Sequence, residues 1–150
     1  MANVLIVYAS LTGNTEEMAE LIAEGIVQSG GGAVLKTAEA CSAEELLDYD
    51  GVLIGSYTWG DGELADEILD LYEELDGIDL NGMRSAAFGS GDTGYDKYCG
   101  AVDLLEAKLS ERGAELVQPG LRMEYGPNAQ EKEDCRAFGR RFSEACQPVT

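Results

Sequence analysis

A six-residue segment near the start of the chain carries side chains that could hold a phosphate group. The segment combines three hydroxyls, an amide and a glycine, in the order Ser10, Leu11, Thr12, Gly13, Asn14 and Thr15. Hydroxyl and amide groups donate hydrogen bonds to an anion, and glycine lets the backbone approach it closely. No Lys or Arg precedes Lys36, so the lysine of nucleoside-triphosphate-binding loops is absent. The segment therefore favours a monophosphate held by neutral donors, with a simple helix cap as the alternative interpretation.

The residues on either side predict that this segment joins a strand to a helix. Residues 4–8 form a short apolar run that is typical of a buried strand. Apolar residues then recur at helical spacing, at Met18, Leu21, Ile22 and Ile26. The segment thus lies at a helix N-terminus, where unpaired backbone N–H groups and the helix dipole favour an anion.

Two further loops are expected to follow the third and fourth strands of the fold, which we predict at 50–55 and 83–88. The second loop carries Ser56, Tyr57, Thr58, Trp59, Gly60 and Asp61. The third loop, residues 89–100, carries Ser90, Gly91, Asp92, Tyr95, Tyr98 and Cys99. Each loop combines glycines with an aromatic side chain and an Asp, which suits the binding of a flat heteroaromatic ring.

Strand-like and helical segments alternate along the whole chain. The remaining strands are predicted at 33–37 and from Ala114 toward Met123, and further helical stripes at 64–75, 102–109 and 135–146. This alternation predicts a single domain over residues 1–150, an α/β three-layer α-β-α sandwich with a five-stranded parallel sheet. The second and fifth strands carry polar residues suited to edges, an arrangement that the strand order 2-1-3-4-5 accommodates.

Composition excludes several classes of protein. The 150 residues include 29 acidic and 10 basic side chains, a net charge of −19, which disfavours nucleic acids and anionic membranes as partners. Histidine is absent, which excludes the usual hydrolase triads. The four cysteines form no Cys-x-x-Cys pair, so we expect free thiols and no metal site. Since neither a signal peptide nor a membrane span is evident, we expect a cytoplasmic protein.

The three loops together resemble those of the short-chain flavodoxins. The resemblance covers residues 2 to 147 and rests on Ser-x-Thr-Gly-Asn-Thr from Ser10, Thr-Trp-Gly-Asp from Thr58 and Gly-Asp-x-x-Tyr from Gly91. It implies the flavodoxin-like fold, the known example in which ligands gather at the carboxyl ends of the first and third strands of a 2-1-3-4-5 sheet. It also implies non-covalently bound FMN, with Trp59 and Tyr95 flanking the ring.

The resemblance further implies the binding role of each loop. Residues 10–15 would hold the phosphate, and Thr58 with the Trp59 indole N–H would add donors to it. Asp92 and the backbone N–H of Cys99 would pair with the polar edge of the flavin. The Gly60-Asp61 peptide and nearby acids would set the redox potentials, whereas Lys97 departs from the family pattern and could weaken the reducing power if it points toward the ring.

The function implied is that of a low-potential one-electron carrier, not an enzyme, that shuttles FMN between quinone, semiquinone and hydroquinone states. Its expected partners are redox proteins with basic docking patches, and the chain is expected to be a monomer. A small FMN-dependent two-electron reductase of the same fold is the alternative. A carrier dedicated to one enzyme is not distinguished from a general shuttle, whereas a phosphorylated receiver domain is disfavoured because Ala9 and Ser10 stand where clustered acids would follow the first strand.

Overall fold

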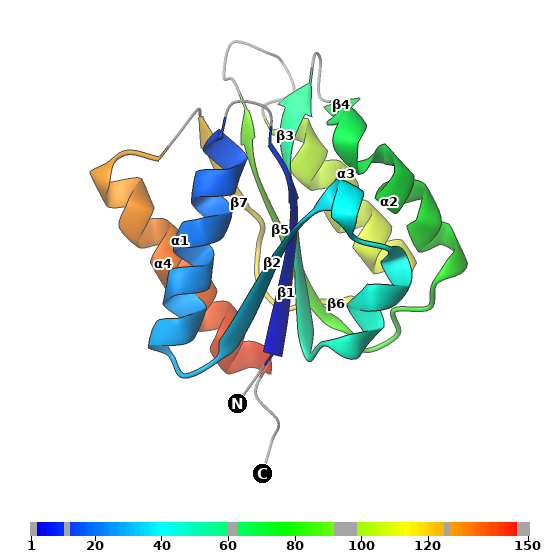
Figure 1. The fold of residues 1–150 in the computed structure, drawn as a ribbon, viewed down its shortest axis with the longest axis horizontal. Coiled ribbons are helices and arrows are strands. Elements are labelled where there is room, and N and C mark those ends of the chain that lie inside the picture. Colours follow the sequence, from blue (N-terminus) through cyan, green and yellow to red (C-terminus); the bar gives the residue numbers. More distant parts are fainter. Residues whose placement is uncertain (1–2, 11–12, 60–62, 92–98, 125–126, 147–150) are drawn as a thin grey trace.

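A parallel sheet lies between two layers of helices (Figure 1). The structure is a computed structural model that describes residues 3–10, 13–59, 63–91, 99–124 and 127–146. Helices α1 (Asn14–Gln28) and α4 (Ala129–Cys146) cover one face of the sheet, and α2 (Leu69–Glu74) and α3 (Gly100–Glu111) cover the other.

The strand order confirms the predicted order 2-1-3-4-5. The order is β2 (Gly32–Thr37), β1 (Asn3–Ala9), β3 (Gly51–Trp59), β5 (Arg84–Gly91) and β6 (Glu115–Leu116), and β7 (Leu121–Glu124) also pairs with β5. All these pairings are parallel. The fifth strand of the prediction is thus two segments, β6 and β7, along one edge.

The break in the fifth strand corrects the prediction of a strand running from Ala114 toward Met123. Residues 117–120 lie outside both strands, and Pro119 among them has no N–H to donate to β5. The backbone N–H of Gly120 instead donates to Glu106 Oε2 at 3.0 Å. A proline and a side-chain acceptor therefore interrupt the ladder without a long insertion.

Strand β3 also extends further than predicted. We expected the strand to end at Gly55, but Ser56 and Tyr57 continue the pairing with β5, and Thr58 and Trp59 pair with a short antiparallel strand, β4 (Glu63–Leu64). Most of the predicted second loop is therefore strand. Leu64, expected on a helical face, lies in β4 for the same reason.

Short 3₁₀ helices complete the fold. They are η1 (Ala38–Ala40), η2 (Ala43–Asp48), η3 (Asp66–Ile68) and η4 (Leu75–Gly77), and the last two flank α2. The predicted helix at 64–75 is consequently a 3₁₀-α-3₁₀ succession that begins at Asp66. No helix in the described part of the chain is both long enough and apolar enough to cross a membrane.

Side chains alternate between the two cores as the period of a strand requires. From β1, Val4 and Ile6 pack toward α1 and α4, whereas Leu5 and Val7 pack toward the opposite layer. The predicted stripe of the last helix is confirmed, since Cys135, Phe138, Phe142 and Cys146 are at most 1% exposed. Each face of the sheet therefore has its own apolar core.

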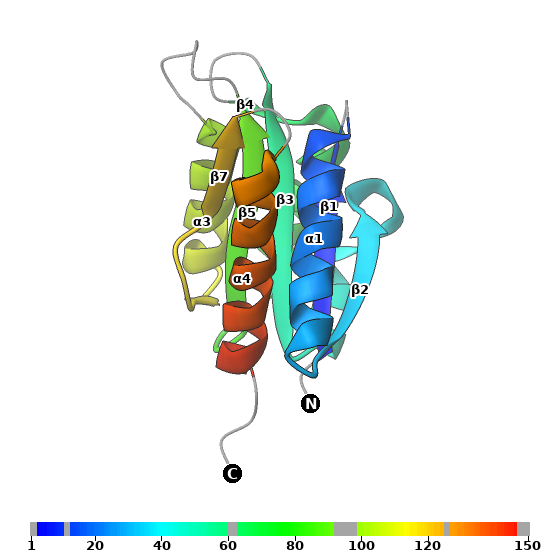
Figure 2. The same ribbon diagram turned by 90° about the vertical axis from the view of Figure 1, so that its left-hand side faces the viewer.

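Helices α1 and α4 pack backbone to backbone, side by side in Figure 2. A methyl group built on Gly25 of α1 would lie 2.0 Å from the carbonyl oxygen of Arg136, and one on Gly139 of α4 would lie 2.1 Å from that of Ile22. Neither position leaves room for a side chain. This contact fixes α1, and hence its N-terminus, against the sheet.

Candidate functional site

The carboxyl ends of β1, β3 and β5 meet the N-terminus of α1 at one end of the molecule, at the top of Figure 1. Ser10 follows β1, Trp59 ends β3 and Gly91 ends β5. The three predicted loops therefore start from one edge of the sheet, as the strand order requires.

The hydroxyl of Ser10 organises the turn before α1. Its Oγ accepts the backbone N–H groups of Gly13, at 3.1 Å, and Glu16, at 3.2 Å. Both bonds use Ser10 as an acceptor, so neither uses the hydrogen of its own hydroxyl. Gly13, the N-cap residue, has φ 91°, a left-handed conformation that favours glycine. The turn thus presents a hydroxyl donor at a helix N-terminus.

Two acidic side chains in the first turn of α1 would repel an anion bound there. The Glu16 carboxylate accepts the Tyr8 hydroxyl at 3.1 Å, and burial followed by this carboxylate raises the pKa of Tyr8. The Glu17 carboxylate lies 3.8 Å from the Lys132 ammonium of α4. Each carboxylate is therefore engaged by a neighbouring hydroxyl or cation.

Thr15 and Ser90 join the first predicted loop to the third. Their hydroxyl oxygens are 2.8 Å apart, and the two residues are 1% and 4% exposed. Thr15 is the second residue of α1, and Ser90 precedes the last residue of β5. The sequence predicted both residues as separate cofactor contacts and did not predict that they bind each other.

The end of β3 is held by hydrogen bonds of its own side chains, two of them to the segment that follows. Ser56 is fully buried, and its hydroxyl donates to the Tyr57 carbonyl at 2.7 Å and accepts the Ala65 N–H at 3.3 Å. The Tyr57 hydroxyl donates to Glu67 Oε2 at 2.7 Å. Burial, followed by the hydrogen bond to this carboxylate, raises the pKa of Tyr57 to about 12. These bonds fix the β3-β4 hairpin.

Thr58 and Gly91 connect this edge to the start of α3. The Oγ1 of Thr58 accepts the Ala101 N–H at 3.3 Å, a bond that does not use the hydrogen of Thr58. A methyl group on Gly91 would lie 2.9 Å from the backbone nitrogen of Cys99. Cys99, the N-cap residue of α3, has φ 51°, which is uncommon for a residue with a side chain. Cys99 thus lies against the end of β5 at a position where only a glycine leaves room.

All four cysteines are free thiols, as the sequence predicted, and all four are buried. Burial raises the pKa of Cys41 and Cys146 to about 11 and that of Cys135 to about 12. The Cys99 sulfur lies 3.6 Å from the Met123 carbonyl oxygen. The raised pKa values keep the thiols of Cys41, Cys135 and Cys146 protonated and unreactive at neutral pH.

Part of the predicted site lies outside the described residues. This part comprises Leu11, Thr12, Gly60, Asp61, Asp92, Tyr95, Lys97 and Tyr98. The predicted stacking of Trp59 and Tyr95 on a ring, and the predicted reorientation of the Gly60-Asp61 peptide, accordingly remain predictions.

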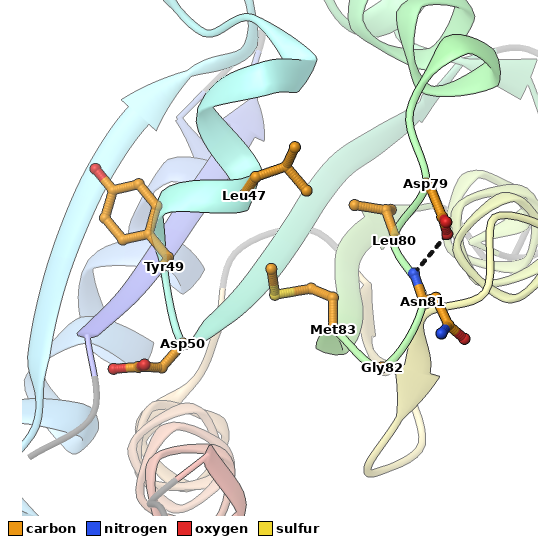
Figure 3. Close-up of a pocket in the computed structure, with 8 residues that line it drawn as sticks. All are labelled: Leu47, Tyr49, Asp50, Asp79, Leu80, Asn81, Gly82 and Met83. Atoms are coloured by element: carbon orange, nitrogen blue, oxygen red, sulfur yellow. Dashed lines mark hydrogen bonds between the residues drawn. The ribbon is translucent and has the colours of Figure 1, made fainter.

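A cavity lies at the opposite end of the sheet (Figure 3). This cavity of about 310 Å³ is lined by Leu47, Tyr49, Asp50, Asp79, Leu80, Asn81, Gly82 and Met83. Its carboxylates already accept backbone N–H groups, Asp50 that of Asn3 and Asp79 that of Asn81. It lies beside the amino ends of β3 and β5, the edge where ligands of this fold class do not gather.

Sequence reasoning missed three supporting residues, Ala65, Glu67 and Ala101. Two of them donate backbone N–H groups, which carry no side-chain signal. Glu67 is one of several acidic residues in a segment predicted as a helix, and nothing in that pattern indicated that it accepts the Tyr57 hydroxyl. These residues hold the predicted site residues in place.

A family model named Flavodoxin matches residues 6–139 of the chain. The chain belongs to the flavodoxin family. Flavodoxins are electron-transfer proteins that bind FMN, so the predicted cofactor is confirmed at the level of the family. "Probable flavodoxin 2" of Bacillus subtilis is 47% identical over 146 residues, which cover 95% of each chain.

Solved flavodoxin structures have the same fold. Oxidised Flavodoxin 2 from Bacillus cereus is 49% identical, has a TM-score of 0.92 and is matched over 96% of this chain and 99% of its own. Oxidised Flavodoxin 1 from Bacillus cereus is 43% identical, with a TM-score of 0.91 and coverage of 95% and 98%. The flavodoxin fold predicted from sequence is therefore confirmed over nearly the full length.

The described residues fit FMN by the chemistry of their donors. The N-terminus of α1 supplies backbone N–H groups and a positive dipole end for a phosphate. Ser10 and Thr58 retain hydroxyl hydrogens that their described bonds do not use. Gly91 keeps the third loop close to β5, where a side chain would collide with Cys99. The carboxylates of Glu16 and Glu17 oppose a phosphate, but each is engaged by a neighbouring group, Tyr8 or Lys132, so these donors still suit an anionic flavin.

Proposed function

We propose that this flavodoxin carries electrons one at a time, at low potential, between redox proteins that present basic docking patches. Bound FMN supplies a ring that accepts and releases electrons. The chain's own residues bind it, exclude water from it and control the electrostatic cost of each added electron.

The proposed binding site is the set of residues predicted from sequence. Residues 10–15 hold the phosphate, Ser56 to Asp61 form the second wall, and the third wall comprises Ser90, Gly91, Asp92, Tyr95, Tyr98 and Cys99. The Ser10 turn at the helix N-terminus supports the first part, because it combines a glycine N-cap with a hydroxyl whose bonds to the described residues leave its hydrogen unused.

The observation that carries the partner proposal is an acidic surface beside the end of β3. Residues 63–73 contain five acidic and no basic side chains. Glu63, Asp66, Asp70 and Glu73 are exposed in this segment, and Leu69 among them is 39% exposed. An apolar side chain amid carboxylates suits a short-lived contact with a basic protein. We name these five residues the acidic docking surface.

Basic side chains gather on the other face of the sheet. Lys132, Arg136, Arg140 and Arg141 all belong to α4, on the layer opposite α2 (Figure 1). Helices α1 and α4 carry eight acidic side chains against these four basic ones, so their layer is acidic overall but less so than residues 63–73. The field of the molecule would therefore turn its more acidic side toward a basic partner before contact.

The same acids favour a low potential. A carboxylate about 8 Å from an added negative charge opposes it by about 2 kcal/mol at an effective dielectric constant near 20. Several carboxylates near the ring would together make a fully reduced cofactor a strong reductant. We also propose that the protein acts in the cytoplasm, because its four buried cysteines are free thiols and disulfides are rare in that compartment.

Stepwise anaerobic reduction of the FMN-loaded protein, followed by its visible spectrum, tests the proposal. A one-electron carrier shows two resolved one-electron steps, with the second potential well below the first. A single two-electron loss of colour would instead favour a two-electron reductase of the same fold.

A further inference from the structure

The hydrogen bond between Thr15 and Ser90 is the one described side-chain link between the first and third predicted loops. It joins residues 75 positions apart in the sequence, at 2.8 Å between hydroxyl oxygens. Both residues are almost fully buried, so water competes little for the bond. The bond lies at the N-terminus of α1, so Thr15 is placed next to an anion bound there.

We propose that Ser90 is a positioning residue for the FMN phosphate and acts through Thr15. Ser90 donates its hydroxyl hydrogen to Thr15 Oγ1, and Thr15 in turn donates its own hydrogen to a phosphate oxygen. The inference rests on the phosphate site proposed at α1 and is independent of how many electrons the flavin transfers.

The direction of the bond follows from counting hydrogens. Each hydroxyl has one hydrogen to donate, and an ionised phosphate oxygen can only accept. If Thr15 donates to the phosphate, its Oγ1 can only accept from Ser90. Ser90 must then be the donor in the pair. A hydroxyl that accepts one bond also becomes a better donor in the next, so Ser90 strengthens the contact between Thr15 and the phosphate.

The backbone around Ser90 is fixed from both sides. Ser90 is paired with Tyr57 of β3 and with Met123 of β7. Before it, a methyl group on Gly89 would lie 2.3 Å from the Ser56 carbonyl oxygen, so the strands are in close contact. Ser90 therefore presents its hydroxyl from a rigid position, which allows it to orient Thr15 before the ligand arrives.

Comparison of FMN with riboflavin isolates the effect of the phosphate, because riboflavin carries the same ring without it. We would measure the dissociation constants of both flavins for the full chain freed of flavin, by quenching of flavin fluorescence. Ser90→Ala is expected to weaken FMN binding about 3- to 10-fold, the effect of one hydrogen bond, and to leave riboflavin binding unchanged. Ser90→Thr keeps the hydroxyl and should restore most of the FMN affinity.

Ser85→Ala is the matched control. Ser85 is a fully buried serine on the same strand, and its hydroxyl donates to the Met83 carbonyl at 3.3 Å, far from the carboxyl end. This variant removes the same atom and should leave the ratio of the two dissociation constants unchanged. In a Thr15→Val background, Ser90→Ala should have no further effect on FMN, because its path through Thr15 is gone.

The ³¹P resonance of bound FMN gives a second readout. Ser90→Ala is expected to shift it, whereas Ser85→Ala is not. The inference is overturned if Ser90→Ala weakens FMN and riboflavin equally, or if it leaves the preference for FMN intact. Equal binding of the two flavins by the unmodified protein would instead reject the phosphate site itself.

Discussion

Hydroxyl side chains at the carboxyl edge of the sheet differ in whether their described hydrogen bonds use the hydroxyl hydrogen. Ser56 both donates and accepts within the β3-β4 hairpin, whereas Ser10 and Thr58 only accept in their described bonds. The residue type alone did not separate these cases. The sequence predicts donors, and only the fold decides which hydroxyls serve the hairpin and which can still donate to a ligand.

Gly13 allows a direct test of the phosphate turn. Gly13→Ala should lower the free energy of unfolding by about 1 to 2 kcal/mol, because φ 91° is unfavourable for a side chain while space for the methyl group is open. Gly30→Ala is a matched control, since Gly30 also has φ 91° and open space but follows the far end of α1. Urea unfolding should show similar losses in both variants, and FMN titration should show weaker binding only in Gly13→Ala. Equal FMN affinities would argue against the turn as the phosphate site.

The raised pKa of Tyr57 predicts that the stability of the protein depends on pH in the alkaline range. Its pKa of about 12 in the folded protein exceeds the ordinary value of 10.0, so its contribution to stability is fully present below pH 10 and is lost as the pH rises toward 12. The stability difference between the protein and Tyr57→Phe, measured by urea unfolding from pH 8 to 12, should therefore shrink across this window. A difference that stays constant to pH 12 would show that neither burial nor the bond to Glu67 raises the pKa of Tyr57.

At the scale of elements, the strands with continuous apolar runs were predicted well and the segments set by long-range pairing were not. Residues 4–8 and 84–88 are strand because their side chains alternate between two buried cores. Ser56 to Trp59 contain turn-like and polar residues, and they are strand because β5 and β4 supply partners from elsewhere in the chain. Pro119 signals the break between β6 and β7, but the apolar residues around it concealed that signal.

The packing of α1 on α4 predicts a strong effect of a single methyl group. Gly139→Ala would place its Cβ 2.1 Å from the Ile22 carbonyl oxygen, so the helices must separate, at a cost of about 3 kcal/mol in the free energy of unfolding. Gly77→Ala has no atom within 4 Å of the new Cβ and should change stability by less than about 0.5 kcal/mol. Chemical denaturation measures both. A neutral Gly139→Ala would mean that the helices can move apart freely.

At the scale of the whole molecule, charge predicts how the carrier meets its partners. The net charge of −19 is distributed unevenly, with the acidic docking surface on one face of the sheet and the basic residues of α4 on the other. Long-range attraction extends over a Debye length of about 30 Å at 0.01 M salt and about 8 Å at 0.15 M. Association with a basic protein should therefore slow steeply as salt is added.

Substitution of two glutamates, one at a time, separates the effect of the acidic docking surface from the effect of net charge alone. Glu73→Gln in the docking surface should slow electron transfer to a basic haem protein about two- to five-fold at low salt, the range expected for one exposed charge pair. Glu144→Gln on α4 makes the same change of charge at another exposed position and should have a smaller effect. Stopped-flow kinetics at two salt concentrations measures both. Equal effects would indicate that only the total charge matters.

The most direct test of the account is a crystal structure of the protein with FMN. We predict the phosphate at the N-terminus of α1, in contact with the Ser10 turn and Thr15, and the flavin ring between the loops that follow β3 and β5. A phosphate found elsewhere, for example in the cavity between Asp50 and Asp79 at the other end of the sheet, would contradict it.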